Sequence, residues 1–167
     1  MFALFKQDIS AKVYAHETWL FCCDCAQTFY EKFKRKLKAA GYLRTPTEDQ
    51  IFMAETMRLH LWVISNALGD NDHNVLEQLH NHAHGLNVVN SKTLRELYVI
   101  YNEAIAKEIE AKEKGVGWPV LASTAIGQLV NNKAHAEVVI ADEVHSDLSS
   151  FHAAICETRS KFKISKV

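Results

Sequence analysis

The stretch that decides the fold runs from Thr45 to Gly69 and reads TPTEDQIFMAETMRLHLWVISNALG. It opens with a helix start signal, because Thr45 can cap a helix, Pro46 suits the first helical position, and Glu48 completes a capping box. At its end, Gly69 supplies the residue type that most readily adopts the left-handed conformation that stops helices. The pattern therefore predicts a helix of 23 residues over 46–68, which would be about 34 Å long.

The predicted helix over 46–68 is apolar on most of its sides. Two stripes at helical spacing contain Met53, Met57, Ile64 and Ala67, and then Ile51, Leu59 and Trp62. A helix of this kind is either wrapped by neighbours or spans a membrane. Glu55, Arg58 and His60 interrupt the run, so fewer than about 18 apolar residues are continuous, which argues against a span. We predict the central helix of a soluble bundle.

The composition favours an all-α fold in one domain. The chain has 167 residues, is 48% hydrophobic, and contains only two prolines and six glycines, which leaves little material for the turns of a many-stranded fold. Its length suits a single domain. We predict one helical domain over 1–167, built from five to six helices, with loose ends at 1–9 and 162–167. The alternative for 1–9 is an arm that docks through Phe2, Leu4 and Phe5.

Start and stop signals divide the rest of the chain into further helices. We predict a helix from Ser10 to Gly41, helices over about 70–84 and 91–114, a short apolar helix over about 119–130, and a last helix from 131 or 132 to about 161. The sequence GVGWP at 115–119 reads as a loop, since the residue before a proline disfavours helical geometry. The charges of AKEIEAKEKG at 106–115 are typical of a helix end that projects into water.

Apolar stripes predict which side of two of these helices is buried. Over 91–114 the stripe is Leu94, Leu97, Tyr98, Tyr101, Ile105 and Ile109. In the last helix it is Ala134, Val138, Ala141, His145, Leu148, His152 and Ile155, at alternating steps of four and three residues. We therefore expect His145 and His152 to be buried, and Trp62, Tyr98 and Tyr101 to lie in or near the core.

The net charge and the cysteines indicate which partners and which cellular compartment to expect. The net charge is −1, so no overall field attracts nucleic acid or an anionic membrane. MFALFKQDIS at 1–10 has one lysine and no long apolar run, unlike a secretory signal. The four cysteines lack disulfide-rich spacing, so we expect reduced thiols and a cytoplasmic location. Cys22, Cys23 and Cys25 are interpreted as small core residues, with a thiolate site that includes Cys156 as the alternative.

Nine histidines raise the question of a metal site. Bundles that hold two irons use a Glu-x-x-His pair on each of two helices. Pairs at this spacing are Glu77 with His80 and, with Asp in place of Glu, Asp142 with His145. His60 and His152 complete this hypothetical set of ligands, and iron or zinc would be the metal. The interpretation that we prefer is structural, with buried neutral histidines that donate to backbone carbonyls and no cofactor.

Three functional classes follow. The preferred one is a protein-interaction or adaptor module that self-associates, because many apolar faces must be covered by only 167 residues. The second is the metal-binding bundle. The third is a nucleic-acid binder that uses the basic patch Lys32, Lys34, Arg35, Lys36 and Lys38, although cations near a helix end ordinarily form a solvated face. We find no serine elbow and no glycine-rich phosphate loop, so a protein without enzymatic activity is favoured.

Overall fold

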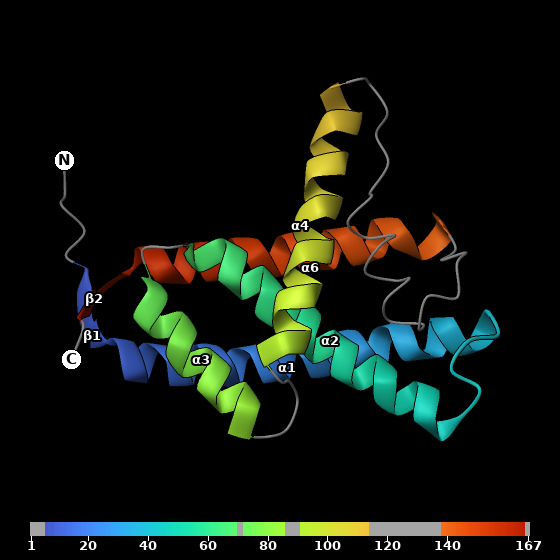
Figure 1. Ribbon diagram of the computed structural model, residues 1–167, viewed down its shortest axis with the longest axis horizontal. Coiled ribbons are helices and arrows are strands. Elements are labelled where there is room, and N and C mark those ends of the chain that lie inside the picture. The colour runs from blue at the N-terminus through green and yellow to red at the C-terminus, as the bar shows by residue number, and fades with distance from the viewer. Residues whose placement is uncertain (1–5, 70–71, 86–90, 114–137, 166–167) are drawn as a thin grey trace.

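A computed structural model of the chain describes residues 6–69, 72–85, 91–113 and 138–165 (Figure 1). Its helices are α1 (Ala11–Ala39), α2 (Pro46–Leu68), α3 (His73–Gly85), α4 (Ser91–Glu113) and α6 (Val138–Ser160). Two short strands, β1 (Gln7–Ser10) and β2 (Phe162–Ser165), accompany them. Five helices among the described residues confirm the all-α class. The predicted helix over 119–130, the GVGWP loop and the start of the last helix lie outside these ranges.

Helix α2 has the bounds that its capping residues predict. The Glu48 backbone N–H donates to Thr45 Oγ1 at 3.2 Å, and the Thr45 N–H donates to the Glu48 carboxylate at 3.1 Å, which is a complete capping box. Gly69 ends the helix with a φ of +65°, where a side chain would be strained. Six consecutive residues, 59–64, are all buried. Because consecutive helical positions point in all directions, α2 is wrapped on every side there, as predicted.

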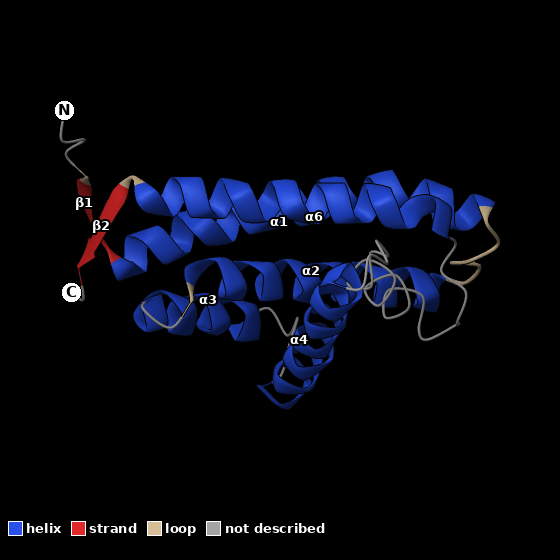
Figure 2. Ribbon diagram, turned by 90° about the horizontal axis from the view of Figure 1, so that it is seen from above, coloured by secondary structure: helices blue, strands red, loops and turns tan. Residues whose placement is uncertain are grey.

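The helices around α2 form two layers. Figure 2 shows α1 and α6 in one layer and α2 and α3 in the other. Helix α2 packs on α1, α6 and α4, while α3 packs on α1. Ion pairs join Lys32 to Asp147 and Lys36 to Glu143, so one turn forward on α1 corresponds to one turn back on α6 and the two helices are antiparallel. The core between the layers includes Trp62 and Tyr101, as predicted, with Tyr98 packed against it.

The prediction of loose ends is wrong where the strands pair. β1 and β2 lie parallel, with Gln7 opposite Phe162 and Ser10 opposite Ser165. The Phe162 ring also packs on Tyr14, with the ring centroids 5.7 Å apart. Strands of four residues carry too few positions for an apolar alternation to be recognised, and their pairing depends on how the bundle places the two ends. Residues 1–5 and 166–167 lie outside the described ranges.

Helix α4 stands away from the layers. Figure 1 shows its C-terminal part projecting beyond the bundle, as the mixed charges of that part predict. Tyr101 and Ala104 are buried, but Ile109, which the sequence places on the same buried stripe, is 55% exposed. The prediction of a buried stripe is confirmed at Tyr101 and wrong at Ile109, because the helix continues past the edge of α2. The side chains of Leu94 and Leu97 lie outside the description.

Candidate functional site

His60 is buried at the centre of the structure, on α2. Only 2% of its surface is exposed, and its ring lies between Phe29 of α1 and Phe151 of α6, at centroid distances of 5.3 and 4.9 Å. Its Nδ1 is 2.8 Å from the backbone oxygen of Thr56. A carbonyl only accepts hydrogen bonds, so Nδ1 carries the proton and Nε2 of the neutral ring is an acceptor. Burial lowers the pKa of His60 to about 4, against the opposing effects of the Thr56 carbonyl and Asp147.

His145 and His152 do not occupy the core positions that the sequence assigns to them. His145 is half-buried and His152 is exposed. The buried stripe of α6 is Ala141, Val144, Leu148, Phe151 and Ile155. This stripe has the same spacing as the predicted one and shares three of its residues, but it is turned slightly about the helix axis. Spacing alone does not distinguish the two stripes, and packing on α2 selects the one with Val144 and Phe151, which buries more apolar surface.

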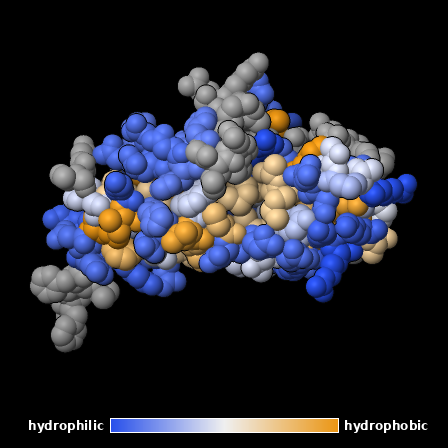
Figure 3. Space-filling model, turned by 90° about the horizontal axis from the view of Figure 1, so that it is seen from below, coloured by the Kyte–Doolittle hydropathy of each residue, from blue (hydrophilic) through white to orange (hydrophobic). Residues whose placement is uncertain are grey.

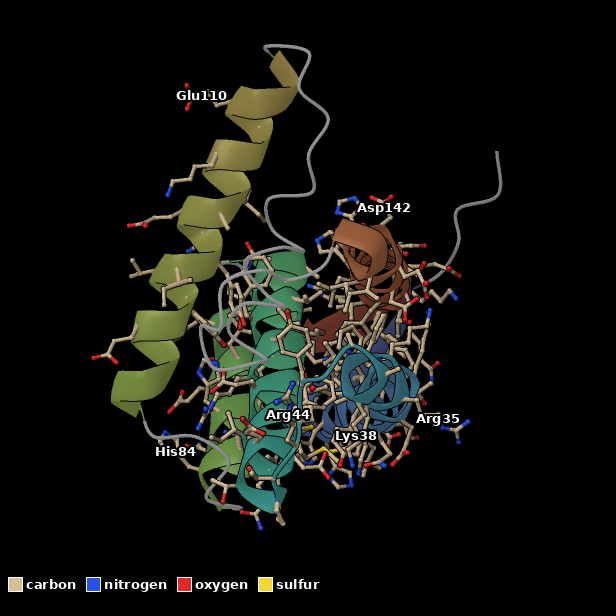
Figure 4. The ribbon with its side chains drawn as sticks, turned by 90° about the vertical axis from the view of Figure 1, so that its right-hand side faces the viewer. Arg35, Lys38, Arg44, His84, Glu110 and Asp142 are labelled. Atoms are coloured by element: carbon tan, nitrogen blue, oxygen red, sulfur yellow. The ribbon has the colours of Figure 1, made fainter. Side chains whose placement is uncertain are left out.

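The remaining hypothetical metal ligands lie on different sides of the molecule. Glu77 is exposed on α3, and Asp142 is exposed near the start of α6 (Figure 4). His80 is half-buried and has Nε2 3.0 Å from the Tyr98 hydroxyl. Within the described ranges, no three or more His, Cys, Asp or Glu side chains are grouped so that they could hold a metal ion. The two pairs from which the metal hypothesis starts are therefore not brought together there.

The basic patch at the end of α1 is largely paired with carboxylates. Lys32 contacts Asp147 at 2.8 Å, Lys34 contacts Asp49 at 2.9 Å, and Lys36 forms an ion pair with Glu143. These pairs tie α1 to α6 and α2. Arg35 and Lys38 are exposed, and Figure 4 shows Arg35 pointing away from the bundle. Three of the five cations already have counter-charges, which reduces the field that a phosphate backbone would meet.

The base of α4 is held by polar contacts to two other helices. The Tyr98 hydroxyl lies 2.9 Å from Ser65 Oγ on α2 and 3.0 Å from His80 Nε2 on α3. Trp62 Nε1 donates to Asn102 Oδ1 at 3.1 Å. Burial raises the pKa of Tyr98 to about 12, so its hydroxyl stays protonated at neutral pH and can donate. These contacts fix the direction in which α4 leaves the bundle.

Exposed apolar side chains occur on two helices of the described structure. They are Val13, Leu20 and Phe21 on α1, and Val99 and Ile109 on α4. Figure 3 shows that apolar side chains on the face seen from below form an interrupted band along the middle of the molecule, bordered by polar ones. Single exposed apolar residues are ordinary on protein surfaces. The pair on α4 differs because it lies on a helix that extends beyond its neighbours.

A cavity of about 500 Å³ opens between α1 and α6, directly beside His60. Phe21, Phe29 and Phe151 form its apolar wall, and Lys32 and Asp147 are among its polar lining residues. The sequence indicates His60 as buried and Phe29 as part of an apolar face. It gives no signal that Phe21, Phe151 and Asp147 meet His60, because they come from helices far apart in the chain. The cysteines of α1 are free, and only Cys22 is fully buried.

Comparison with protein families, curated proteins and solved structures gave no match. The function must therefore be inferred from the chain's own geometry. In the part of the chain that the structure describes, no helix is both long enough and apolar enough for a membrane span.

Proposed function

We propose that the chain is a protein-interaction module that self-associates through the exposed side of α4. The observation that carries this proposal is the exposure of Ile109 on a helix that has left the bundle (Figure 1). Tyr98, Tyr101 and Ile105 belong to the same apolar stripe and pack on the core. Among the described residues, the stripe thus continues at Ile109 beyond the contact with α2, and apolar helix surface that its own fold leaves uncovered is typical of an interface.

Stability also favours a partner for this part of α4. Among the described elements, α4 packs mainly on α2. A helix draws most of its stability in water from tertiary packing, and an isolated segment shorter than about 12–15 residues is marginal. The outer turns of α4 would gain that packing from a second helix.

The exposed side of α4 is compatible with a second copy of itself. Val99 and Ile109 are both exposed, at 57% and 55%, and lie on the same half of the helix. An antiparallel pair can place Val99 of one copy against Ile109 of the other.

The proposal is tested by sedimentation at a series of protein concentrations. We expect a monomer–dimer equilibrium that Ile109→Lys weakens at least tenfold, since burying an isoleucine contributes about 1.5–3 kcal/mol and each dimer contains two. Val13→Lys is the matched control, because Val13 is 50% exposed but lies on α1. A wild-type chain that stays monomeric at millimolar concentration, or equal effects of the two variants, would contradict the proposal.

A further inference from the structure

The cavity between α1 and α6 has an aromatic wall, and the His60 ring lines it. Phe21 and Phe151 have ring centroids 5.6 Å apart, and Phe151 in turn contacts the His60 ring. A volume of about 500 Å³ is within the range of small-molecule sites, which is about 300–1,000 Å³. Phe21 is 39% exposed, so this part of the cavity is open to solvent.

The acceptor is Nε2 of His60. Its Nδ1 donates back to the Thr56 carbonyl of the same helix, so Nε2, on the far side of the ring, faces away from the α2 backbone. The ring lines the cavity, and the described residues offer Nε2 no hydrogen-bond partner. Unlike the buried atoms that lack a partner, such as the Tyr101 hydroxyl, Nε2 of His60 keeps some contact with solvent. A ligand with a donor group can therefore take the place of the water that would otherwise bind Nε2.

The charges beside the cavity restrict the chemistry of that ligand. Lys32 is already bound to Asp147 at 2.8 Å, so the cation is not free to hold a carboxylate or a phosphate. The lone pair of Nε2 would also repel an anionic oxygen, which is itself an acceptor. The Asp24 carboxylate also lines the cavity and would repel an anion as well. An uncharged molecule with an N–H or O–H group satisfies these conditions.

We propose that this cavity binds a small, uncharged aromatic molecule that donates one hydrogen bond to Nε2 of His60. The aromatic body packs among Phe21, Phe29 and Phe151, where offset or edge-to-face ring contacts are favourable. The donor reaches the imidazole beside that wall. This binding site is separate from the surface of α4 and does not depend on self-association.

Indole and indene are suitable probes, because they have nearly the same shape and only indole carries an N–H donor. In calorimetric titrations we expect the wild-type chain to bind indole at least tenfold more tightly than indene. In ¹H–¹⁵N correlation spectra that report on the histidine rings, indole should move the Nε2 resonance of His60 upfield, as expected when an acceptor nitrogen receives a hydrogen bond. Equal or tighter binding of indene, or no binding of indole at millimolar concentration, would overturn the proposal.

Two neighbouring residues on α1 provide a matched pair of variants. Phe21 lines the cavity, whereas Leu20 is similarly exposed and does not. We expect Phe21→Ala to weaken indole binding at least fivefold and Leu20→Ala to leave it unchanged. Equal effects would place the bound indole elsewhere and overturn the proposal.

The variant His60→Phe removes the acceptor but keeps a ring in the aromatic cluster. It should abolish the preference for indole over indene, and a preference that persists would contradict the assigned acceptor. If this variant does not fold, the His60 Nε2 resonance of the wild-type chain tests whether Nε2 is the acceptor. A resonance that indole does not shift would overturn the assignment.

Discussion

His60 makes the stability of the fold depend on pH. Its pKa is about 4 in the folded chain and 6.5 without burial, so between these values the unfolded chain binds more protons. Stability therefore rises with pH across this window. The contribution of His60 is complete above about pH 6.5 and is lost progressively as the pH falls to about 4.

We expect this loss to amount to about 2–4 kcal/mol of unfolding free energy. The measurement is a set of urea unfolding curves at several pH values for the wild-type chain and for His60→Phe. Taking the difference between the two chains cancels the groups that titrate in both. A difference that stays constant from pH 7 to pH 4 would show that the His60 environment is not as described.

Two tyrosines one turn apart on α4 differ in whether their hydroxyl groups form hydrogen bonds. Tyr98 bonds to Ser65 and His80, whereas the buried Tyr101 hydroxyl has no hydrogen-bond partner among the described residues. We expect Tyr98→Phe to destabilise the fold by about 1–2 kcal/mol and Tyr101→Phe to be neutral or slightly stabilising. Chemical denaturation of both variants gives the comparison. A larger loss for Tyr101→Phe would mean that its hydroxyl is bonded after all.

Helix α6 is joined to the start of α3 by one partly buried ion pair. Arg159 donates from Nε and Nη2 to the two carboxylate oxygens of Asp72, at 2.5 and 2.8 Å, and Asp72 is almost fully buried. Arg159 also donates from Nη1 to the Phe162 carbonyl at 2.9 Å, which positions β2. A single side chain therefore links three elements.

Removing Arg159 should cost far more than removing an exposed lysine nearby. Arg159→Ala leaves a buried carboxylate without its partner, and we expect a loss of about 2–4 kcal/mol. Lys161 pairs with Glu157 on the surface, so Lys161→Ala should change stability by less than about 0.5 kcal/mol. Thermal unfolding of both variants tests this. Similar midpoints would mean that the Arg159 pair adds no more than a surface contact.

Among the elements, residues within or next to the helix are sufficient to predict the bounds of α2. They are not sufficient to predict which side of α6 is buried. The bounds of α2 follow from Thr45, Pro46 and Gly69, whose effects act within a few residues. The buried side of α6 depends on which of two equivalent stripes meets α2, and this is decided by packing between helices. For the same reason the wall around His60 could not be predicted, although the burial of His60 itself could.

At the scale of the whole molecule, α4 and the paired strands depart most from a simple bundle. The composition predicts helices, and the described residues are helical apart from two four-residue strands and the connecting turns. The assembled fold determines the point at which α4 ends its contact with α2. Ile109 belongs to a correctly recognised apolar stripe, yet whether it is covered depends on the length of a neighbouring helix.

The parallel pairing of β1 with β2 also affects the order of events during synthesis. More than 150 residues separate Gln7 from Phe162. A ribosome adding roughly 5–20 residues per second needs about 8–30 s to make that length, during which β1 has no partner strand. The bundle helices can form in this interval from contacts closer in sequence. The strands then pair after the helices, and the first turn of α1 has no β2 beside it until residues 162–165 have been made.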